Sequence, residues 1–73
     1  MTLEADVAKI HAARSAADLV QPGMIVGLGS GSTAALMVKR LGERVAEEGL
    51  EFVGVPTSVS TAELAREVGI PLR

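Results

Sequence analysis

The sequence contains no cysteine, no tryptophan and no tyrosine, and Phe52 is its one aromatic residue. The lack of cysteine excludes disulfides and thiolate metal sites and fits a reducing compartment. With one aromatic ring, the core must be filled by small aliphatic side chains, which suit close packing of helices on a sheet. No apolar run approaches the roughly 20 residues that a membrane helix needs, and residues 1–20 lack the unbroken apolar segment of a secretory signal. We therefore expect a soluble cytoplasmic protein.

The sequence also lacks a large excess of either positive or negative charge. Seven basic residues oppose nine acidic ones, for a net charge of -2. Interspersed charges create no long-range field that would gather nucleic acid or anionic lipid, so we expect neither as a partner. Any anion must be held by local contacts. At 73 residues, the chain is about half a typical domain, and we expect its core to be small.

Hydrophobic spacing predicts helices that alternate with strands. Apolar residues three and four apart predict a first helix from Leu3 to about Val20. Pro22-Gly23 then fits a type II turn. The same periodicity predicts a second helix over about 33–47 and a third over about 61–68.

Two apolar segments predict short buried strands: residues 24–28, which we expect to be covered on both faces, and residues 52–55. Residues 70–72 resemble the start of a third strand. This order predicts an α/β fold, a Rossmann-like parallel sheet with flanking helices, of which only the first βαβ portion is present. Because two parallel strands leave apolar edges and faces uncovered, we expect the chain to be a fragment, or the ordered beginning, of a longer α/β protein.

A glycine- and hydroxyl-rich stretch, IVGLGSGSTAAL, joins the first strand to the second helix. Ligands bind at such turns, beyond the carboxyl ends of parallel strands. Gly29 and Gly31 permit backbone angles that side chains forbid, and the helix start directs unpaired amides to the same place. With the hydroxyls of Ser30, Ser32 and Thr33, the stretch suits a phosphate or an oxygen-rich sugar. Alternatively, the glycines only make a tight turn and Ser32 only caps the helix.

Stricter motifs do not fit this loop. The dinucleotide fingerprint needs a glycine where the chain has Ser32, and an acid near the end of the second strand, where it has Pro56, Thr57 and Ser58. A Walker A loop needs a lysine directly after its last glycine, and this loop contains no lysine. The glycine pattern of a nucleophile elbow surrounds neither Ser30 nor Ser32. We therefore expect no nicotinamide cofactor and no nucleophilic serine.

A second hydroxyl cluster, VPTSVSTAEL, follows the second strand and contains Thr57, Ser58, Ser60 and Thr61. If the two strands are neighbours, both clusters lie at the same edge of the sheet and can face one ligand. Alternatively, Ser60 caps the third helix in a capping box with Glu63, and the other hydroxyls are solvated.

Two side chains of the predicted first helix, Lys9 and His11, carry groups that can bind a ligand or transfer a proton. Lys9 can pair with a phosphate only if the start of the first helix folds back over the loop, and is otherwise a surface lysine. His11 has no carboxylate or second histidine at ligand spacing, so we predict no metal site and no chemical role for it.

The segments QPGMIVGLGSGSTA and VPTSVSTAELAREVGIPL resemble the amino-terminal part of the type A ribose-5-phosphate isomerase family, from about Lys9 to Leu72. The loop at this distance from a hydroxyl cluster that leads into GIPL makes the resemblance specific. It implies an enzyme that interconverts D-ribose 5-phosphate and D-ribulose 5-phosphate in the non-oxidative pentose phosphate pathway. It also implies that no cofactor is used and that the enzyme is a cytoplasmic homodimer or homotetramer.

The resemblance implies substrate-binding roles for Ser30, Gly31, Ser32 and Thr33, and places Lys9 near the substrate's phosphate. The family more often has threonine at the position of Ser30, which keeps the hydroxyl and loses a methyl group. The donor therefore survives, although its contact geometry differs.

The proton-transfer groups of the family lie downstream of GIPL. Aldose–ketose isomerisation needs a base that moves a proton between adjacent carbons and a group that stabilises the enediolate. The family uses a glutamate, aspartates and a lysine for these tasks, so we assign no catalytic residue in this chain and expect it to be inactive alone. The chain has further glutamates that match none of the family positions: Glu43, Glu47, Glu48, Glu51, Glu63 and Glu67.

The sequence is also compatible with a second class of function. Sugar-phosphate-sensing effector domains of some bacterial transcription regulators are similar to this isomerase fold and use a comparable loop. An Asp-Gly-Ala-Asp-Glu-like stretch and a glycine-rich lysine stretch downstream would indicate the enzyme, whereas an amino-terminal helix-turn-helix would indicate the regulator. A nonfunctional fragment is a third possibility.

Overall fold

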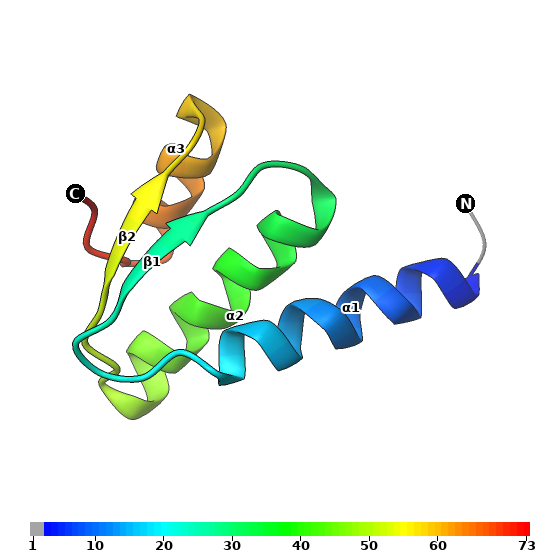
Figure 1. The fold of residues 1–73 in the computed structure, drawn as a ribbon, viewed down its shortest axis with the longest axis horizontal. Helices are drawn as coiled ribbons and strands as arrows, with labels where there is room; N and C mark the ends of the chain where they lie inside the picture. Colours follow the sequence, from blue (N-terminus) through cyan, green and yellow to red (C-terminus); the bar gives the residue numbers. More distant parts are fainter. Residues whose placement is uncertain (1–2) are drawn as a thin grey trace.

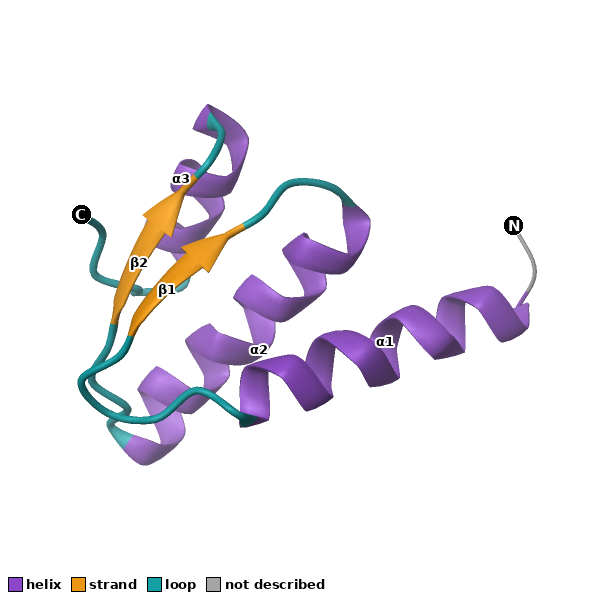
Figure 2. Ribbon diagram, in the orientation of Figure 1, coloured by secondary structure: helices purple, strands orange, loops and turns teal. Residues whose placement is uncertain are grey.

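The computed structural model describes residues 3–73, with side chains described from Val7 onward. Helices and strands alternate in the predicted order, and Figures 1 and 2 show α2 (Ser32–Glu48) lying between the two strands and α1 (Leu3–Asp18). None of the described helices is long and apolar enough to cross a membrane. The elements are α1 (Leu3–Asp18), β1 (Ile25–Leu28), α2 (Ser32–Glu48), β2 (Val53–Pro56) and α3 (Val59–Glu67).

The two strands form a parallel sheet with β1 beside β2. A further parallel bridge joins Leu72 to Gly54. The Gly54 N–H donates to the Pro71 carbonyl at 2.8 Å, and the Arg73 N–H donates to the Gly54 carbonyl at 3.0 Å. The third strand expected to begin near residue 70 is thus confirmed as a bridge, and β2 is paired on both sides.

Helices cover one face of this sheet within the described chain. Leu28 and Gly54 on that face are buried, and Leu28 packs in one cluster with Leu41 of α2 and Ala65 of α3. On the opposite face Ile25 is 59% exposed. The expectation that the first strand is covered on both faces is therefore wrong for residues 3–73, because α2 and α3 pack against the same face.

The connection between α1 and β1 is the predicted type II turn. Gly23 has φ 87°, and the Met24 N–H donates to the Gln21 carbonyl at 3.2 Å across Pro22-Gly23. This turn requires positive φ at its third residue, which glycine adopts without steric cost. The turn ends α1 before β1 begins, and α1 stops at Asp18 instead of Val20.

Among the described side chains of the apolar stripe predicted for α1, those in its second half are buried and those before it are exposed. Ala13 and Ala17 have 1% and 0% exposure, whereas Val7 and Ile10 have 45% and 43%. Small side chains at the buried positions allow α1 to approach α2 closely. The first half of α1 reaches the beginning of α2 through Lys9, which contacts Ser32.

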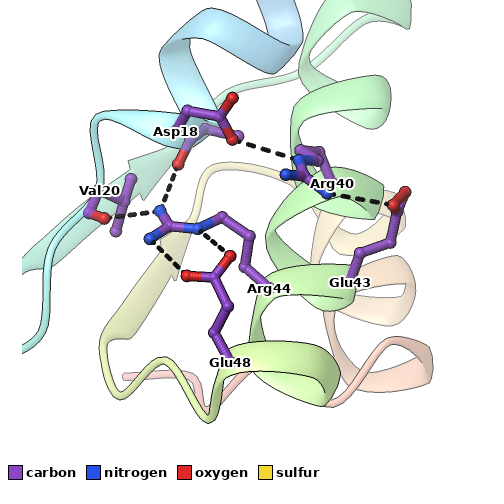
Figure 3. A network of polar contacts seen from close by, with 7 residues as sticks. Asp18, Val20, Arg40, Glu43, Arg44 and Glu48 are labelled. Carbon is purple, nitrogen blue, oxygen red and sulfur yellow. Dashed lines mark hydrogen bonds and ion pairs between the residues drawn. The ribbon is translucent and has the colours of Figure 1, made fainter.

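Arg44 of α2 fixes the end of α1 (Figure 3). Its Nη1 donates to the carbonyls of Ala17 at 2.8 Å and Val20 at 2.6 Å. Its Nε and Nη2 donate to the two carboxylate oxygens of Glu48 at 3.1 and 3.2 Å. The Ala17 carbonyl lies in the last turn of α1, where carbonyls lack helical partners, and it also accepts from the Val20 N–H at 3.2 Å. The Val20 carbonyl lies two residues beyond the end of α1.

Arg40, one turn earlier on α2, makes a second link between these helices (Figure 3). It donates to Asp18 of α1 at 3.2 Å and to Glu43 at 3.4 Å. The hydrogen bond that Arg40 donates to Asp18 raises the pKa of the Arg40 guanidinium. Both acids are about half exposed, so this pair contributes less to stability than the Arg44 contacts.

Candidate functional site

The glycine loop leads into α2 through Gly31, which is the N-cap residue with φ 97°. Within the described chain no side chain caps this helix, and the Ala35 N–H makes the first helical bond, to the Gly31 carbonyl at 3.0 Å. The amides of Ser32, Thr33 and Ala34 are therefore left without helical acceptors. The alternative that Ser32 only caps the helix is wrong, because Ser32 is already the first helical residue.

The beginning of α2 is electrostatically suited to an anion. Its first turn contains no acidic residue, so the positive end of the helix dipole is not neutralised by a neighbouring carboxylate. Three amides and the hydroxyls of Ser32 and Thr33 project from one turn, and both residues are exposed. This is the local chemistry with which helix starts bind phosphate groups.

Gly31 and Gly29 differ in what their backbones require. The positive φ of Gly31 is a conformation that L side chains rarely adopt. The expectation of special angles at Gly29 is wrong, because its φ is not positive. A Cβ at Gly29 would meet the Ala34 Cβ at 3.7 Å, an ordinary contact.

Lys9 of α1 reaches this loop. Its Nζ donates to the Ser32 Oγ at 3.2 Å, so α1 does lie over the start of α2, as the proposed role of Lys9 required. The ammonium group therefore lies beside the exposed amides at the beginning of α2. One positive side chain and one helix start converge on the same position, although they are 23 residues apart in sequence.

The second hydroxyl cluster lies at the same edge of the sheet, as predicted. Thr57 donates through its Oγ1 to the Leu28 carbonyl at 2.9 Å, and its Oγ1 lies 3.4 Å from the Ser30 Oγ. Thr61 donates through its Oγ1 to the Gly29 carbonyl at 3.1 Å. Two threonines thus hold the backbone of the glycine loop by their hydroxyls.

The cap of α3 is Ser58 and not Ser60. The Ser58 Oγ accepts from the Thr61 N–H at 3.2 Å, and the helix begins at Val59, two residues earlier than predicted. The capping box between Ser60 and Glu63 is therefore wrong. The hydroxyl of Ser60 is exposed and lies 3.3 Å from the Ser58 Oγ.

Among the side chains described from Val7 onward, no titratable group other than Lys9 has a recorded contact with residues 29–33. No group of three or more metal-ligating side chains occurs among the described residues. His11 is exposed on α1. Most of the glutamates lie on the second half of α2 or on α3, away from Ser32 in sequence and helix position. The arrangement can bind an anion, and its described residues offer no base beside that anion.

Comparison with known proteins gives consistent relatives. No family model matches the chain. Ribose-5-phosphate isomerase A of Cereibacter sphaeroides is 67% identical over 67 residues, which are 92% of this chain and 27% of that protein. The chain thus spans about a quarter of the length of such curated relatives.

Solved structures agree with this match. Ribose 5-phosphate isomerase A from Methanocaldococcus jannaschii has a TM-score of 0.86 at 48% identity, over 89% of this chain and 29% of that one. A D-ribose-5-phosphate isomerase in complex with phospho-erythronic acid has a TM-score of 0.86 at 40% identity, over 100% of this chain and 31% of that one. In sequence and in fold, this chain therefore matches the amino-terminal part of ribose-5-phosphate isomerase A, as its motifs predicted.

Proposed function

We propose that this chain supplies the substrate-binding loop of an aldose–ketose isomerase that interconverts D-ribose 5-phosphate and D-ribulose 5-phosphate. The single observation that carries the proposal is the convergence of Lys9 on Ser32, at a distance of 3.2 Å, beside the uncapped start of α2. An ammonium group, free amides and hydroxyls are the groups that bind a phosphate monoester. The relatives named above carry this activity in their names.

In this proposal Ser30, Gly31, Ser32 and Thr33 bind the sugar phosphate, and Lys9 neutralises part of its charge. The relative solved with phospho-erythronic acid supports a ligand of this class, because that acid is an oxygen-rich chain with a phosphate at one end. Nothing in the comparisons favours the regulator that the sequence left open.

The proton transfer is assigned to residues outside this chain. Residues 1–73 would be the amino-terminal portion of a single larger α/β catalytic domain, which the exposed sheet face supports. We place the enzyme in the non-oxidative pentose phosphate pathway, without cofactor, as a cytoplasmic homodimer or homotetramer. Light scattering of the complete protein tests the oligomeric state.

Removal of the loop hydroxyls tests the proposed site. We expect the double variant Ser32→Ala, Thr33→Ala of the complete protein to bind ribose 5-phosphate roughly 10- to 100-fold more weakly, because two contacts of about 1 to 1.5 kcal/mol are lost. Isothermal titration calorimetry measures the affinity. Unchanged affinity in a folded double variant would refute the role of the loop.

Lys9→Met tests the proposed counter-charge, with Lys39→Met as the matched control. Lys39 is an exposed lysine on α2, two turns beyond the loop. We expect only Lys9→Met to weaken binding, and the loss to be smaller at high salt because screening already weakens the wild-type contact. Equal losses in both variants would indicate a diffuse charge effect instead of a contact.

A further inference from the structure

The second hydroxyl cluster contains one side chain that is closed to ligands and still touches the glycine loop. Thr61 is 8% exposed. A hydroxyl has one proton to donate, and that of Thr61 goes to the Gly29 carbonyl at 3.1 Å. The same Oγ1 accepts from the Ser58 Oγ at 2.9 Å. Both recorded hydrogen bonds of the Thr61 hydroxyl, one donated and one accepted, are therefore made to other groups of the protein.

Ser58 fixes the direction of this chain of hydrogen bonds. As the cap of α3, its Oγ accepts from the Thr61 N–H at 3.2 Å. The Ser58 hydroxyl then donates its proton to the Thr61 Oγ1. The Thr61 hydroxyl therefore donates its own proton to the Gly29 carbonyl. The start of α3 and the glycine loop are thereby joined through two hydroxyls.

The Gly29 carbonyl determines where the next amide points. In a trans peptide unit the C=O of one residue and the N–H of the next point in opposite directions. With the Gly29 carbonyl held toward α3, the Ser30 N–H points away from α3. Among the described residues, no acceptor is recorded for this N–H.

The preceding peptide unit is fixed in the same manner. The Leu28 carbonyl accepts from the Thr57 N–H at 3.2 Å and from the Thr57 Oγ1 at 2.9 Å. The two peptide units that enter the loop are therefore each held by a threonine hydroxyl that comes from the segment after β2. A loop with few buried contacts of its own gains a defined orientation from these bonds.

We propose that Thr61 is a positioning residue for substrate binding: its hydrogen bond to the Gly29 carbonyl keeps the loop amides aimed at the phosphate. This inference rests on the proposed function, and it assigns to Thr61 no contact with the substrate. Loss of the bond would let the Gly29–Ser30 peptide unit rotate, so that part of the population would present a carbonyl where the phosphate binds. Affinity would fall, and the chemical step would change little.

The test compares Thr61→Val with Thr61→Ser in the complete protein. Valine keeps the shape and removes the hydroxyl, whereas serine keeps the hydroxyl. We expect Thr61→Val to raise KM for ribose 5-phosphate roughly 5- to 10-fold, the effect of one lost hydrogen bond, with kcat within about twofold of wild type. Thr61→Ser should restore KM. A wild-type KM in Thr61→Val, or equal losses in both variants, would overturn the proposal.

Two controls separate positioning from loss of stability. Ser60→Ala removes an exposed hydroxyl from the same turn of α3 without touching the loop. Ala65→Gly destabilises the same helix at a buried position away from the loop. We expect both to keep the wild-type KM, Ala65→Gly with a lowered Tm. If Ala65→Gly raises KM as much as Thr61→Val, the effect is merely structural and the proposal is wrong.

A measurement that does not depend on turnover distinguishes the two proposals. Inorganic phosphate is titrated while the amide chemical shifts of residues 29–34 are followed. If the wild-type protein binds phosphate there but lacks isomerase activity, the proposed function fails, and a roughly 5- to 10-fold weaker phosphate affinity in Thr61→Val still supports positioning. Loop amides that respond neither to phosphate nor to ribose 5-phosphate would overturn both.

Discussion

At the residue scale, Arg44 has the largest number of recorded polar contacts. It bridges two carbonyls at the end of α1 and both oxygens of Glu48, and its side chain is 12% exposed. Its partners Ala17 and Val20 are 27 and 24 positions away. Helical periodicity describes which residues share a face of one helix, so it contains no information about this contact between two helices.

Replacement of Arg44 by alanine should lower the free energy of unfolding. The substitution removes the recorded donor of the part-buried Val20 carbonyl and one of the two recorded donors of the Ala17 carbonyl, and a loss of about 1 to 3 kcal/mol is expected. Urea denaturation followed by circular dichroism measures the change. Lys39→Ala, at an exposed position on the same helix, is the control and should change stability by less than about 0.5 kcal/mol. Similar losses in both variants would contradict the role of Arg44.

The pairing of Arg44 with Glu48 predicts a dependence of stability on pH. The hydrogen bond from Arg44 lowers the pKa of the Glu48 carboxyl. A carboxyl with a lowered folded pKa stabilises the protein above its unfolded pKa, and this contribution is lost as pH falls through the folded pKa. Because Glu48 is half exposed, the effect is expected to be small.

Glu48→Gln checks this pH dependence. We expect the variant to have a lower Tm than wild type at neutral pH, and the difference to shrink as the pH falls below the unfolded glutamate pKa of about 4.3. Thermal unfolding at a series of pH values measures it. A Tm difference that stays constant down to acidic pH would show that the charge of Glu48 is not responsible.

At the element scale, α2 and α3 meet at a glycine. Gly42 of α2 is buried, and a Cβ at this position would overlap the Cβ of Val68 and lie 2.7 Å from its Cγ2 and 3.0 Å from its carbonyl oxygen. A contact with backbone does not yield as the end of a flexible side chain does. The small residue therefore sets the distance between the two helices that cover the sheet.

Gly42→Ala is accordingly expected to destabilise the protein. Alanine favours a helix interior by about 1 kcal/mol over glycine, but overpacking a close contact costs typically 1–3 kcal/mol, so a net loss of up to about 2 kcal/mol should appear in chemical denaturation. Gly29→Ala is the control, because a Cβ at Gly29 would meet the Ala34 Cβ at 3.7 Å, an ordinary contact, and the φ of Gly29 is not positive. A stabilised Gly42→Ala would mean that the helices separate without penalty.

The order of elements was predictable because periodicity and turn residues act locally. Alternating segments, the Pro22-Gly23 turn and the loop before α2 all follow from neighbours in sequence. The cap of α3 was misplaced because Ser58 and Ser60 are both plausible caps, and the choice depends on the Thr61 N–H, which only the folded helix brings to the Ser58 Oγ. Local signals also could not assign Thr57 and Thr61 to the carbonyls of Leu28 and Gly29, which lie 29 and 32 residues earlier.

The sequence singled out the residues of the candidate site, but it did not predict the contacts that hold them in place. The hydroxyls and Gly31 of the loop stand out in the sequence. Lys9 was expected near the loop only if the start of α1 lies over it, and the contact of Lys9 with Ser32 meets this condition. Gly29 was misjudged, since a glycine can be present without a backbone angle that demands it. Resemblance to a family supplied the ligand, which no pattern of spacing could name.

At the scale of the whole molecule, the described helices leave one sheet face bare. Ile25 and Val55 are 59% and 36% exposed there, and Met24 beside them is 42% exposed. Contiguous apolar surface of this kind promotes association. The chain matches about 27% of its relative, so the missing cover is expected from the rest of the proposed domain.

A chain of residues 1–73 made alone should therefore bind a dye such as ANS and should not convert ribose 5-phosphate. The first result is expected from the bare sheet face, and the second from the lack of a base at the loop among the described residues. Fluorescence and a coupled assay measure them. Turnover at a rate typical of enzymes would contradict our assignment of the proton transfer to other residues, and a chain that binds no dye would show that this face is covered.

The bridge between Leu72 and Gly54 has a consequence for how the sheet can grow. Because β2 is paired on both sides, the edge of β1 that faces away from β2 has no partner strand among the described residues. Any parallel strand that docks there would finish next to the Gly29–Thr33 turn. Functional groups at its tip would then lie within reach of whatever the turn binds, a position that would suit the proton-transfer group of the proposed isomerase.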